Sequence, residues 1–396
     1  MDSALISSPA GILAILAAVT SLFFFLEKKT GWTLFNYFPP LLFIYLVPVG
    51  LSNSGLIPSS APVYDFMGDN VLPMFLVIML LKVDLLATVR VMGKGIFVML
   101  MGTLGVMVGA PIAYFLVSHG LGPEAWKAFG ALAGSWIGGT GNMLAVGQMV
   151  DLDESSVEFG YAVIADNAVY LIWLPIMLGS KNLARWFHRF TRVSSQRLER
   201  MERAAKELTV DKGPMEMRHF LYLIFIGFAV TVLCIFLSGH IEPVRTSSGQ
   251  IIVSANTYKI LLVTVFGVGL SFTGASRIPG SHAFSMALVY LFVARMGAKA
   301  DLSGLDASVL WFLLGAYIWI FIHGGVLLGA ARLFRVDVHT AAISSAANIG
   351  GAASAPIVAA YHKPALVPVS VLMALLGYAI GNPAAYAAAL LCRWVG

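Results

Sequence analysis

Residues 135–146 read SWIGGTGNMLAV, and this stretch decides how the chain folds. It lies within an apolar region of membrane-spanning length, yet it contains the polar and flexible run Gly138-Gly139-Thr140-Gly141-Asn142. Glycine weakens a helix by about 1 kcal/mol relative to alanine. Irregular backbone at membrane depth is tolerated only where it is buried in protein or lines a wet cavity. We therefore interpret the stretch as a functional break in a membrane-embedded helix.

The composition is that of a membrane protein. Of the 396 residues, 59% are hydrophobic and only 11% are charged, whereas soluble domains carry about 25% charged residues. Apolar runs of about 17–25 residues, which match the thickness of a bilayer, recur along the chain. They lack the alternation of apolar and polar residues that a β-barrel requires. The sequence therefore predicts an all-α, polytopic integral membrane protein.

The apolar runs divide the chain into ten expected spans and two interrupted stretches. Residues 10–26 have no basic segment before them, so we interpret them as the first span rather than as a cleavable signal. The expected spans are 10–26, 39–54, 70–88, 95–117, 157–178, 219–238, 257–274, 282–298, 308–334 and 365–391. The interrupted stretches are 127–149 and 339–360.

A basic connector over residues 179–218 separates two halves of the chain, and its Lys181–Arg218 portion carries ten Lys or Arg residues. Glu199/Arg203 and Glu202/Lys206 have the i,i+4 spacing of helical ion pairs. The positive-inside rule assigns this segment to the cytoplasm. It is either a solvated link or a contact for anionic lipid headgroups. Because the basic residues gather in loops, the net charge of +5 does not indicate nucleic-acid binding.

The distribution of charge also constrains the interrupted stretches. If the loops are assigned alternately to the two sides of the membrane, starting from a cytoplasmic connector, 18 of the 25 basic residues fall on the cytoplasmic side. Six fall on the outer side, and Lys82 is unassigned. The six outside are Lys127, Arg245, Lys259, Arg295, Lys299 and Arg393. This topology requires each interrupted stretch to enter and leave on the same side of the membrane. We therefore expect two re-entrant hairpins, one from each face.

Four short motifs recur in the same order in the two halves, offset by roughly 212–221 residues. They pair 49–58 with 268–279, 81–85 with 298–302, 135–146 with 347–358, and 165–170 with 380–386. We interpret residues 1–178 and 219–396 as inverted repeats, each with five transmembrane helices and one hairpin. Inverted repeats with broken helices at matching positions are typical of secondary transporters.

The two hairpin tips are the expected solute site. Free N–H groups at the ends of half-helices favour an anion, while small residues that only permit close helix packing are the alternative interpretation. The candidate solute-binding residues are Gly138, Gly139, Thr140, Asn142, Asn348, Gly350, Gly351 and Ser354.

Asp166 is the acidic residue placed most clearly inside a span, beside Asn167. An intramembrane carboxylate is functional by default, so we predict ion coupling at Asp166, Asn167 and the matching Asn382. The alternative is a hydrogen-bonded aspartate that braces the first hairpin. His323 is expected to be a packing residue, and the pairs Lys82/Asp84 and Lys299/Asp301 are expected to lie at span ends, where a gating role stays open. The two cysteines indicate neither a disulfide framework nor a metal site.

The motifs GSWIGGTGN, IADN, AANIGG and GYAIGN resemble an uncharacterised membrane family, domain of unknown function 819. That family is similar to the superfamily of cation–proton antiporters and anion symporters, which includes sodium–glutamate and sodium–citrate symporters. The resemblance implies a transport core that slides against a dimeric scaffold domain. The second tip reads GGAAS where many relatives have a Pro-Thr pair, so Ser354 is expected to replace that hydroxyl. The first tip lacks the histidine of the glutamate carriers, so glutamate is not implied.

We therefore expect a secondary active transporter, coupled to Na⁺ or H⁺, for a small organic anion, with an elevator-type mechanism. The alternative is a cation–proton antiporter without an organic substrate. An intramembrane enzyme is a remote third possibility, because the sequence shows neither paired catalytic aspartates nor HExxH or GxSxG. No cofactor is expected beyond the coupling ion. The expected partners are the solute, membrane lipids and a second copy of the chain, in a bacterial-type cytoplasmic membrane.

Overall fold

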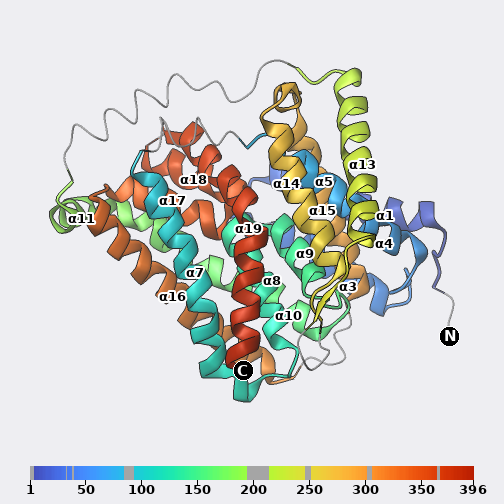
Figure 1. Cartoon of the computed structure of the whole chain (residues 1–396), viewed down its shortest axis with the longest axis horizontal. Helices are drawn as coiled ribbons and strands as arrows, with labels where there is room; N and C mark the ends of the chain where they lie inside the picture. The colour runs from blue at the N-terminus through green and yellow to red at the C-terminus, as the bar shows by residue number, and fades with distance from the viewer. Residues whose placement is uncertain are drawn as a thin grey trace.

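The computed structural model describes residues 4–32, 34–37, 40–83, 93–193, 214–245, 251–300, 306–363 and 366–396. These residues are almost wholly helical (Figure 1), and the exception is an antiparallel ribbon of β1 (Val244–Arg245) and β2 (Ile251–Val253). Within the described ranges, eight helices are long and apolar enough to cross a membrane. The prediction of an α-helical, multi-pass integral membrane protein is confirmed.

The helices before the connector are α1 (Pro9–Thr30), α2 (Leu34–Tyr37), α3 (Pro40–Asn53), α4 (Pro62–Phe66), the π-helical turn η1 (Met67–Val71), α5 (Leu72–Leu80), α7 (Gly95–Val117), the 3-10 turn η2 (Ser118–Gly120), α8 (Ala125–Gly138), α9 (Thr140–Met149) and α10 (Val157–Gly179). The 3-10 turn η3 (Ser180–Leu183) and α11 (Ala184–Thr191) begin the connector.

The later helices are α13 (Met217–Gly239), α14 (Ala255–Ser271), the 3-10 turn η4 (Gly274–Arg277), α15 (Ser281–Lys299), α16 (Ser308–Phe334), α17 (Val338–Ile349), α18 (Gly351–His362) and α19 (Val367–Val395). Of the ten expected spans, only the one near 70–88 is displaced. Its helical region begins at Pro62, which suits the first helical position. It ends at Leu80, where Val83 N–H closes a turn on the Leu80 carbonyl at 3.1 Å.

Several predicted features lie outside the described residues. They are the helix with Glu199/Arg203 and Glu202/Lys206, and the acidic partners Asp84 and Asp301. The basic members of the pairs Lys82/Asp84 and Lys299/Asp301 do lie at helix ends, as predicted. Lys82 follows α5, and Lys299 is the last residue of α15.

Two long antiparallel helices, α7 and α16, pack closely at small residues. A methyl group at Gly102 would lie 3.2 Å from the His323 ring, and one at Gly109 would lie 3.0 Å from Trp319 Nε1. The Trp319 Nε1–H donates to the Val106 carbonyl at 2.8 Å. Such close packing is how glycine-rich membrane helices associate. His323 is fully buried, and its two ring nitrogens contact the Gly102 carbonyl at 2.9 Å and Ser345 Oγ at 3.1 Å, which fits the predicted packing role.

Each interrupted stretch folds back on itself. In the first, a methyl group at Gly134 of α8 would lie 2.6 Å from the Asn142 carbonyl of α9. At the base of this hairpin, Lys127 Nζ donates to the Asp151 carbonyl at 3.2 Å. In the second, the Nδ1 atoms of His339 and His362 lie 3.0 Å apart at the base. Each hairpin therefore begins and ends at one side of the helical bundle.

The two hairpins approach each other from opposite ends of the α7–α16 pair (Figure 1). α8 follows the C-terminal end of α7, and α17 follows the C-terminal end of α16. Because α7 and α16 are antiparallel, these ends lie at opposite sides of the bundle. The arrangement directs both glycine-containing tips toward the interior.

Candidate functional site

The glycine tips of the two hairpins touch. A methyl group built on Gly351 would lie 3.5 Å from Gly139 Cα. Gly139 has φ 76° and ψ −178°, and Gly351 has φ 57°. The Tyr378 ring of α19 lies against both glycines, at 3.5 and 3.6 Å from the positions of such methyl groups. The backbone of two segments more than 200 residues apart in sequence therefore meets at one point.

Both tips present the start of a helix. α9 begins at Thr140 and α18 begins at Gly351, directly after the respective breaks. The first N–H groups of a helix have no partner within it and carry partial positive charge. Two such ends beside each other form an environment that favours a negatively charged group, and the glycines allow it to approach the backbone.

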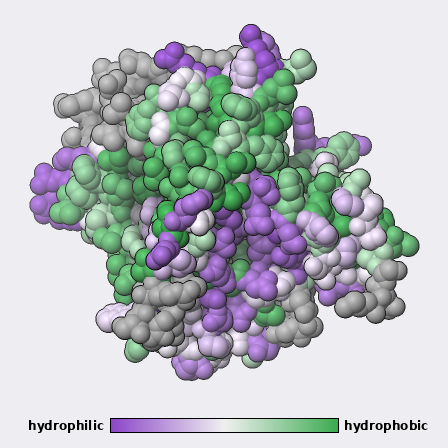
Figure 2. Space-filling view, turned by 45° about the vertical axis from the view of Figure 1, so that its right-hand side comes forward, coloured by the Kyte–Doolittle hydropathy of each residue, from purple (hydrophilic) through white to green (hydrophobic). Residues whose placement is uncertain are grey.

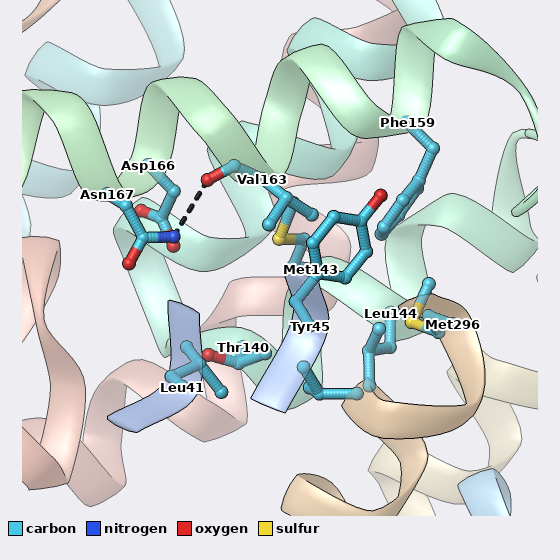
Figure 3. A pocket seen from close by; sticks show the side chains of 11 residues that line it. Leu41, Tyr45, Thr140, Met143, Leu144, Phe159, Val163, Asp166, Asn167 and Met296 are labelled. Atoms are coloured by element: carbon cyan, nitrogen blue, oxygen red, sulfur yellow. Dashed lines mark hydrogen bonds between the residues drawn. The ribbon is translucent and has the colours of Figure 1, made fainter. Parts of the chain in front are cut away.

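A small cavity of about 20 Å³ lies beside the first tip (Figure 3). It brings together three of the predicted site residues: Thr140, Asp166 and Asn167. Most of its wall is apolar. The remaining lining residues are Leu41, Tyr45, Met143, Leu144, Phe159, Val163, Val293 and Met296. The cavity therefore offers a small number of polar groups within a mostly apolar wall, and it has room for about one water-sized group.

The Asp166 carboxylate joins α10 to the first hairpin. Its Oδ2 accepts a hydrogen bond from Ser135 Oγ at 2.8 Å, and its Oδ1 accepts one from Trp136 Nε1 at 3.0 Å. The bracing contact considered from the sequence is therefore present. A carboxylate oxygen has about two acceptor sites, so these two bonds leave acceptor capacity for a further ligand.

The same face of α10 also reaches the second tip. Tyr170, one helical turn after Asp166, lies close to the side chain of Ser354. A methyl group at Gly350 would lie 3.2 Å from the Tyr170 ring. One helix thus contacts both tips through residues four positions apart.

The predicted asparagines anchor the tips. Asn142 and Asn348 are both fully buried. Asn142 Nδ2 donates to the Tyr378 carbonyl of α19 at 3.0 Å, and Asn348 Nδ2 donates to the Met99 carbonyl of α7 at 3.2 Å. Thr103 Oγ1 lies 3.5 Å from Asn348 Oδ1.

The structure brings only some of the predicted ion-coupling residues to the cavity. Asn167 lines the cavity, and its Nδ2 donates to the Val163 carbonyl of its own helix at 2.8 Å (Figure 3). Asn382 does not line the cavity. Its Nδ2 donates instead to Thr264 Oγ1 of α14 at 2.8 Å.

Sequence reasoning did not single out four residues around the tips. Ser135 and Trp136 belong to the quoted motif, and Tyr170 lies four residues after Asp166, so helical spacing could have suggested them. Tyr45 lines the cavity from α3, but it belongs to an ordinary apolar span that carries no local signal.

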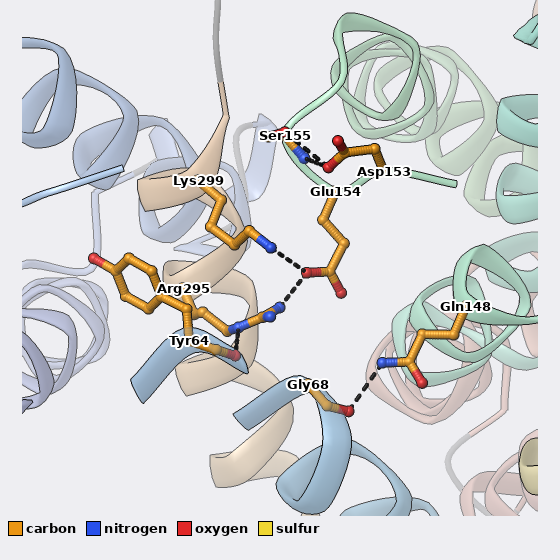
Figure 4. Close-up of polar contacts among 8 residues, drawn as sticks. All are labelled: Tyr64, Gly68, Gln148, Asp153, Glu154, Ser155, Arg295 and Lys299. Carbon is orange, nitrogen blue, oxygen red and sulfur yellow. Dashed lines mark hydrogen bonds and ion pairs between the residues drawn. The ribbon is translucent and has the colours of Figure 1, made fainter. Parts of the chain in front are cut away.

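A second polar cluster joins the exit loop of the first hairpin to α15 (Figure 4). The Arg295 side chain is 2% exposed, pairs with Glu154, and donates from Nε to the Tyr64 carbonyl at 2.6 Å. Lys299 Nζ lies 3.5 Å from the same Glu154 carboxylate. Beside this cluster, Gln148 Nε2 donates to the Gly68 carbonyl of η1 at 2.9 Å. The cluster ties the base of the first hairpin to α4, η1 and α15.

Glu154→Ala is expected to lower the free energy of unfolding by about 3–5 kcal/mol, because it leaves the buried Arg295 guanidinium without its counter-charge. Thermal unfolding of the purified protein measures the change. Glu124→Ala is the matched control: Glu124 is 54% exposed and pairs with Lys127, so its loss is expected to cost about 0–1 kcal/mol. Equal, small effects of the two variants would contradict a structural role for the Arg295–Glu154 pair.

Two comparisons relate the chain to known proteins. The sequence profile of the family described as "Protein of unknown function (DUF819)" matches residues 14–395. The protein named "Uncharacterized membrane protein YjcL" from Bacillus subtilis (strain 168) is 24% identical to this chain over 378 residues, which cover 94% of this chain and 93% of the relative. Neither description states an activity, so a functional argument depends on the geometry.

Proposed function

The chain belongs to the DUF819 family, as its hairpin motifs predicted, and we propose from the geometry of its hairpins that it is a secondary active transporter for a small organic anion. The proposal rests on one observation above all. The glycine tips of two hairpins that enter from opposite ends of the bundle touch each other, Gly351 against Gly139. Broken helices that meet near the bilayer midplane are the element around which many transporters build a binding site.

In this proposal the two halves of the chain are inverted repeats, residues 1–178 and 219–396. The transport core comprises α7–α10 and α16–α19, and the scaffold domain comprises α1–α5 and α13–α15. The core slides against the scaffold in an elevator-type movement, and the scaffold forms a homodimer in a bacterial-type cytoplasmic membrane. The connector at 179–218 lies on the cytoplasmic side.

The substrate class follows from the groups at the tips. Two helix N-termini supply N–H donors and partial positive charge, and Thr140 and Ser354 add hydroxyl groups. Asp166 would repel an anion placed directly against it, so in this proposal it serves the coupling cation. Binding the cation first lowers that repulsion and thereby couples the two ligands. The expected driving ion is Na⁺ or H⁺.

The test uses full-length protein in proteoliposomes on a solid-supported membrane. Small carboxylates and amino acids are applied one at a time under an inward Na⁺ gradient, an inward H⁺ gradient, or neither. We expect a transient current for at least one anion that requires one of the gradients. If no anion produces a current while a pH gradient alone drives Na⁺ or K⁺ movement, the protein is a cation–proton antiporter and the proposal fails.

A further inference from the structure

Two buried amide oxygens near the first tip have no protein partner among the residues that the structure describes. They are Oδ1 of Asn142 and Oδ1 of Asn382. Asn142 is 0% exposed and Asn382 is 1% exposed. A buried acceptor left without a partner costs about 1–3 kcal/mol, so two such groups in one region need an explanation.

The orientation of both amides is determined by their neighbours. Asn142 Nδ2 faces the Tyr378 carbonyl, which can only accept a hydrogen bond. Asn382 Nδ2 faces Thr264 Oγ1, whose own hydrogen is donated to the Ile260 carbonyl at 2.9 Å. Turning the Asn142 amide over would place two acceptors against each other, and turning the Asn382 amide over would cost the Thr264 hydroxyl its bond to the Ile260 carbonyl. The unpartnered atoms are therefore the oxygens and not the NH₂ groups.

Both asparagines adjoin one turn of α19: Asn382 belongs to it, and Asn142 packs on it. In a regular α-helix the N–H of residue 382 points to the carbonyl of residue 378, and that same Tyr378 carbonyl accepts from Asn142. A methyl group at Gly381 would lie 2.9 Å from Asn142 Cγ. The side chain of Asn142 thus packs directly against the residue that precedes Asn382.

A third oxygen becomes available in this turn because of a proline. Pro383 lies inside α19 and has no N–H, so the carbonyl of Ala379 lacks its usual helical donor. Two amide oxygens and one main-chain carbonyl therefore lie around residues 378–383. All three are neutral oxygen ligands that cannot take up a proton near neutral pH, whereas free carbonyls of this kind suit Na⁺.

We propose that Asn142 Oδ1, Asn382 Oδ1 and the Ala379 carbonyl bind Na⁺ between α9 and α19. The inference rests on the proposed transport function and adds a Na⁺ site of neutral ligands to the cation coupling that is proposed at Asp166. Binding would fasten α9, which carries the first tip, to α19, whose Tyr378 ring also lies against the second tip. The ion would therefore order the surroundings of both tips before the solute arrives.

The test measures thermal unfolding of purified full-length protein in NaCl, KCl or choline chloride at equal ionic strength. A ligand that binds only the folded state stabilises it by about 2.7 kcal/mol at 100 times its Kd. We expect the unfolding midpoint to rise with Na⁺ concentration and to respond much less to K⁺ and choline. Equal midpoints in the three salts would show that the oxygens hold water only and would overturn the site.

Substitutions test whether the Na⁺-dependent rise in the unfolding midpoint arises at the proposed site. Asn382→Leu is expected to abolish the Na⁺-dependent rise, and Asn382→Asp is expected to retain it with a lower half-saturating concentration, because it adds charge. Asn348→Leu is the matched control, since Asn348 is equally buried but contacts partners through both amide atoms. It should lower the midpoint in every salt and keep the Na⁺-dependent rise. An unchanged rise in Asn382→Leu would refute the assignment.

These measurements do not depend on transport, so the two proposals can fail separately. A Na⁺-dependent unfolding midpoint without any proteoliposome current would support the cation site and refute the proposed transport function. Na⁺-driven currents without a Na⁺-dependent unfolding midpoint would support the transport function and show that Na⁺ binds at a different site.

Discussion

Gly139→Ala is expected to reduce gradient-driven currents by about 5- to 150-fold. Gly139 has φ 76° and ψ −178°, a region that is essentially restricted to glycine. The space itself would accept a methyl group, because the nearest atom, in the Tyr378 ring, would lie 3.5 Å away. The variant therefore tests backbone conformation alone. Strain of this kind costs about 1–3 kcal/mol, and about 1.4 kcal/mol corresponds to a factor of ten in an equilibrium.

The currents of the variant are measured in the same proteoliposome assay, with thermal unfolding as a second measurement. Gly325→Ala is the matched control, because Gly325 lies within α16, no atom would approach its methyl group within 4 Å, and its φ is not positive. Alanine favours a helix there, so its currents and stability should equal or exceed those of the parent. Full currents in Gly139→Ala would show that the tip does not need this conformation.

The sequence predicted the hairpins well because their signal is local. Paired glycines interrupt an apolar run, and the expected stretches at 127–149 and 339–360 differ by two residues or fewer from the bounds of α8–α9 and α17–α18. The positions of Asp166 and Asn167 beside the first tip could also be anticipated, because an acid inside a span is conspicuous. Such features depend on a few neighbouring residues.

Features that depend on distant partners could not be predicted. Nothing in the sequence around Tyr45 indicates that it lines the same cavity as Asp166, because α3 and α10 are brought together only by folding. Asn382 was predicted by repeat symmetry to share ion coupling with Asp166, but it does not line the cavity beside Asp166, and its Nδ2 donates to Thr264 of α14. Charge counting assigned Arg295 to the outer side of the membrane, but it gave no sign that the side chain would be 2% exposed and paired with Glu154. Charge counting records the side of the bundle but not burial.

Asp166→Asn is expected to lower ion-driven solute currents by about 5- to 150-fold, the range of a coupling free energy of about 1–3 kcal/mol. The substitution removes the charge while it preserves the hydrogen bonds. The new amide oxygen can accept from Trp136 Nε1, and the new NH₂ can donate to Ser135 Oγ, because a hydroxyl group both donates and accepts. The fold should therefore tolerate the change, and a lost current would report the missing carboxylate.

Two further variants separate charge from bracing. Ser135→Ala keeps the carboxylate but removes one of its hydrogen bonds, so it should lower the unfolding midpoint while ion-driven currents persist. Asp65→Asn removes an exposed carboxylate in α4 and should change neither property. If Asp166→Asn keeps full currents and Ser135→Ala loses them, the aspartate acts only as a brace for the first hairpin. Ion coupling would then have to depend on the neutral oxygens around α19 alone.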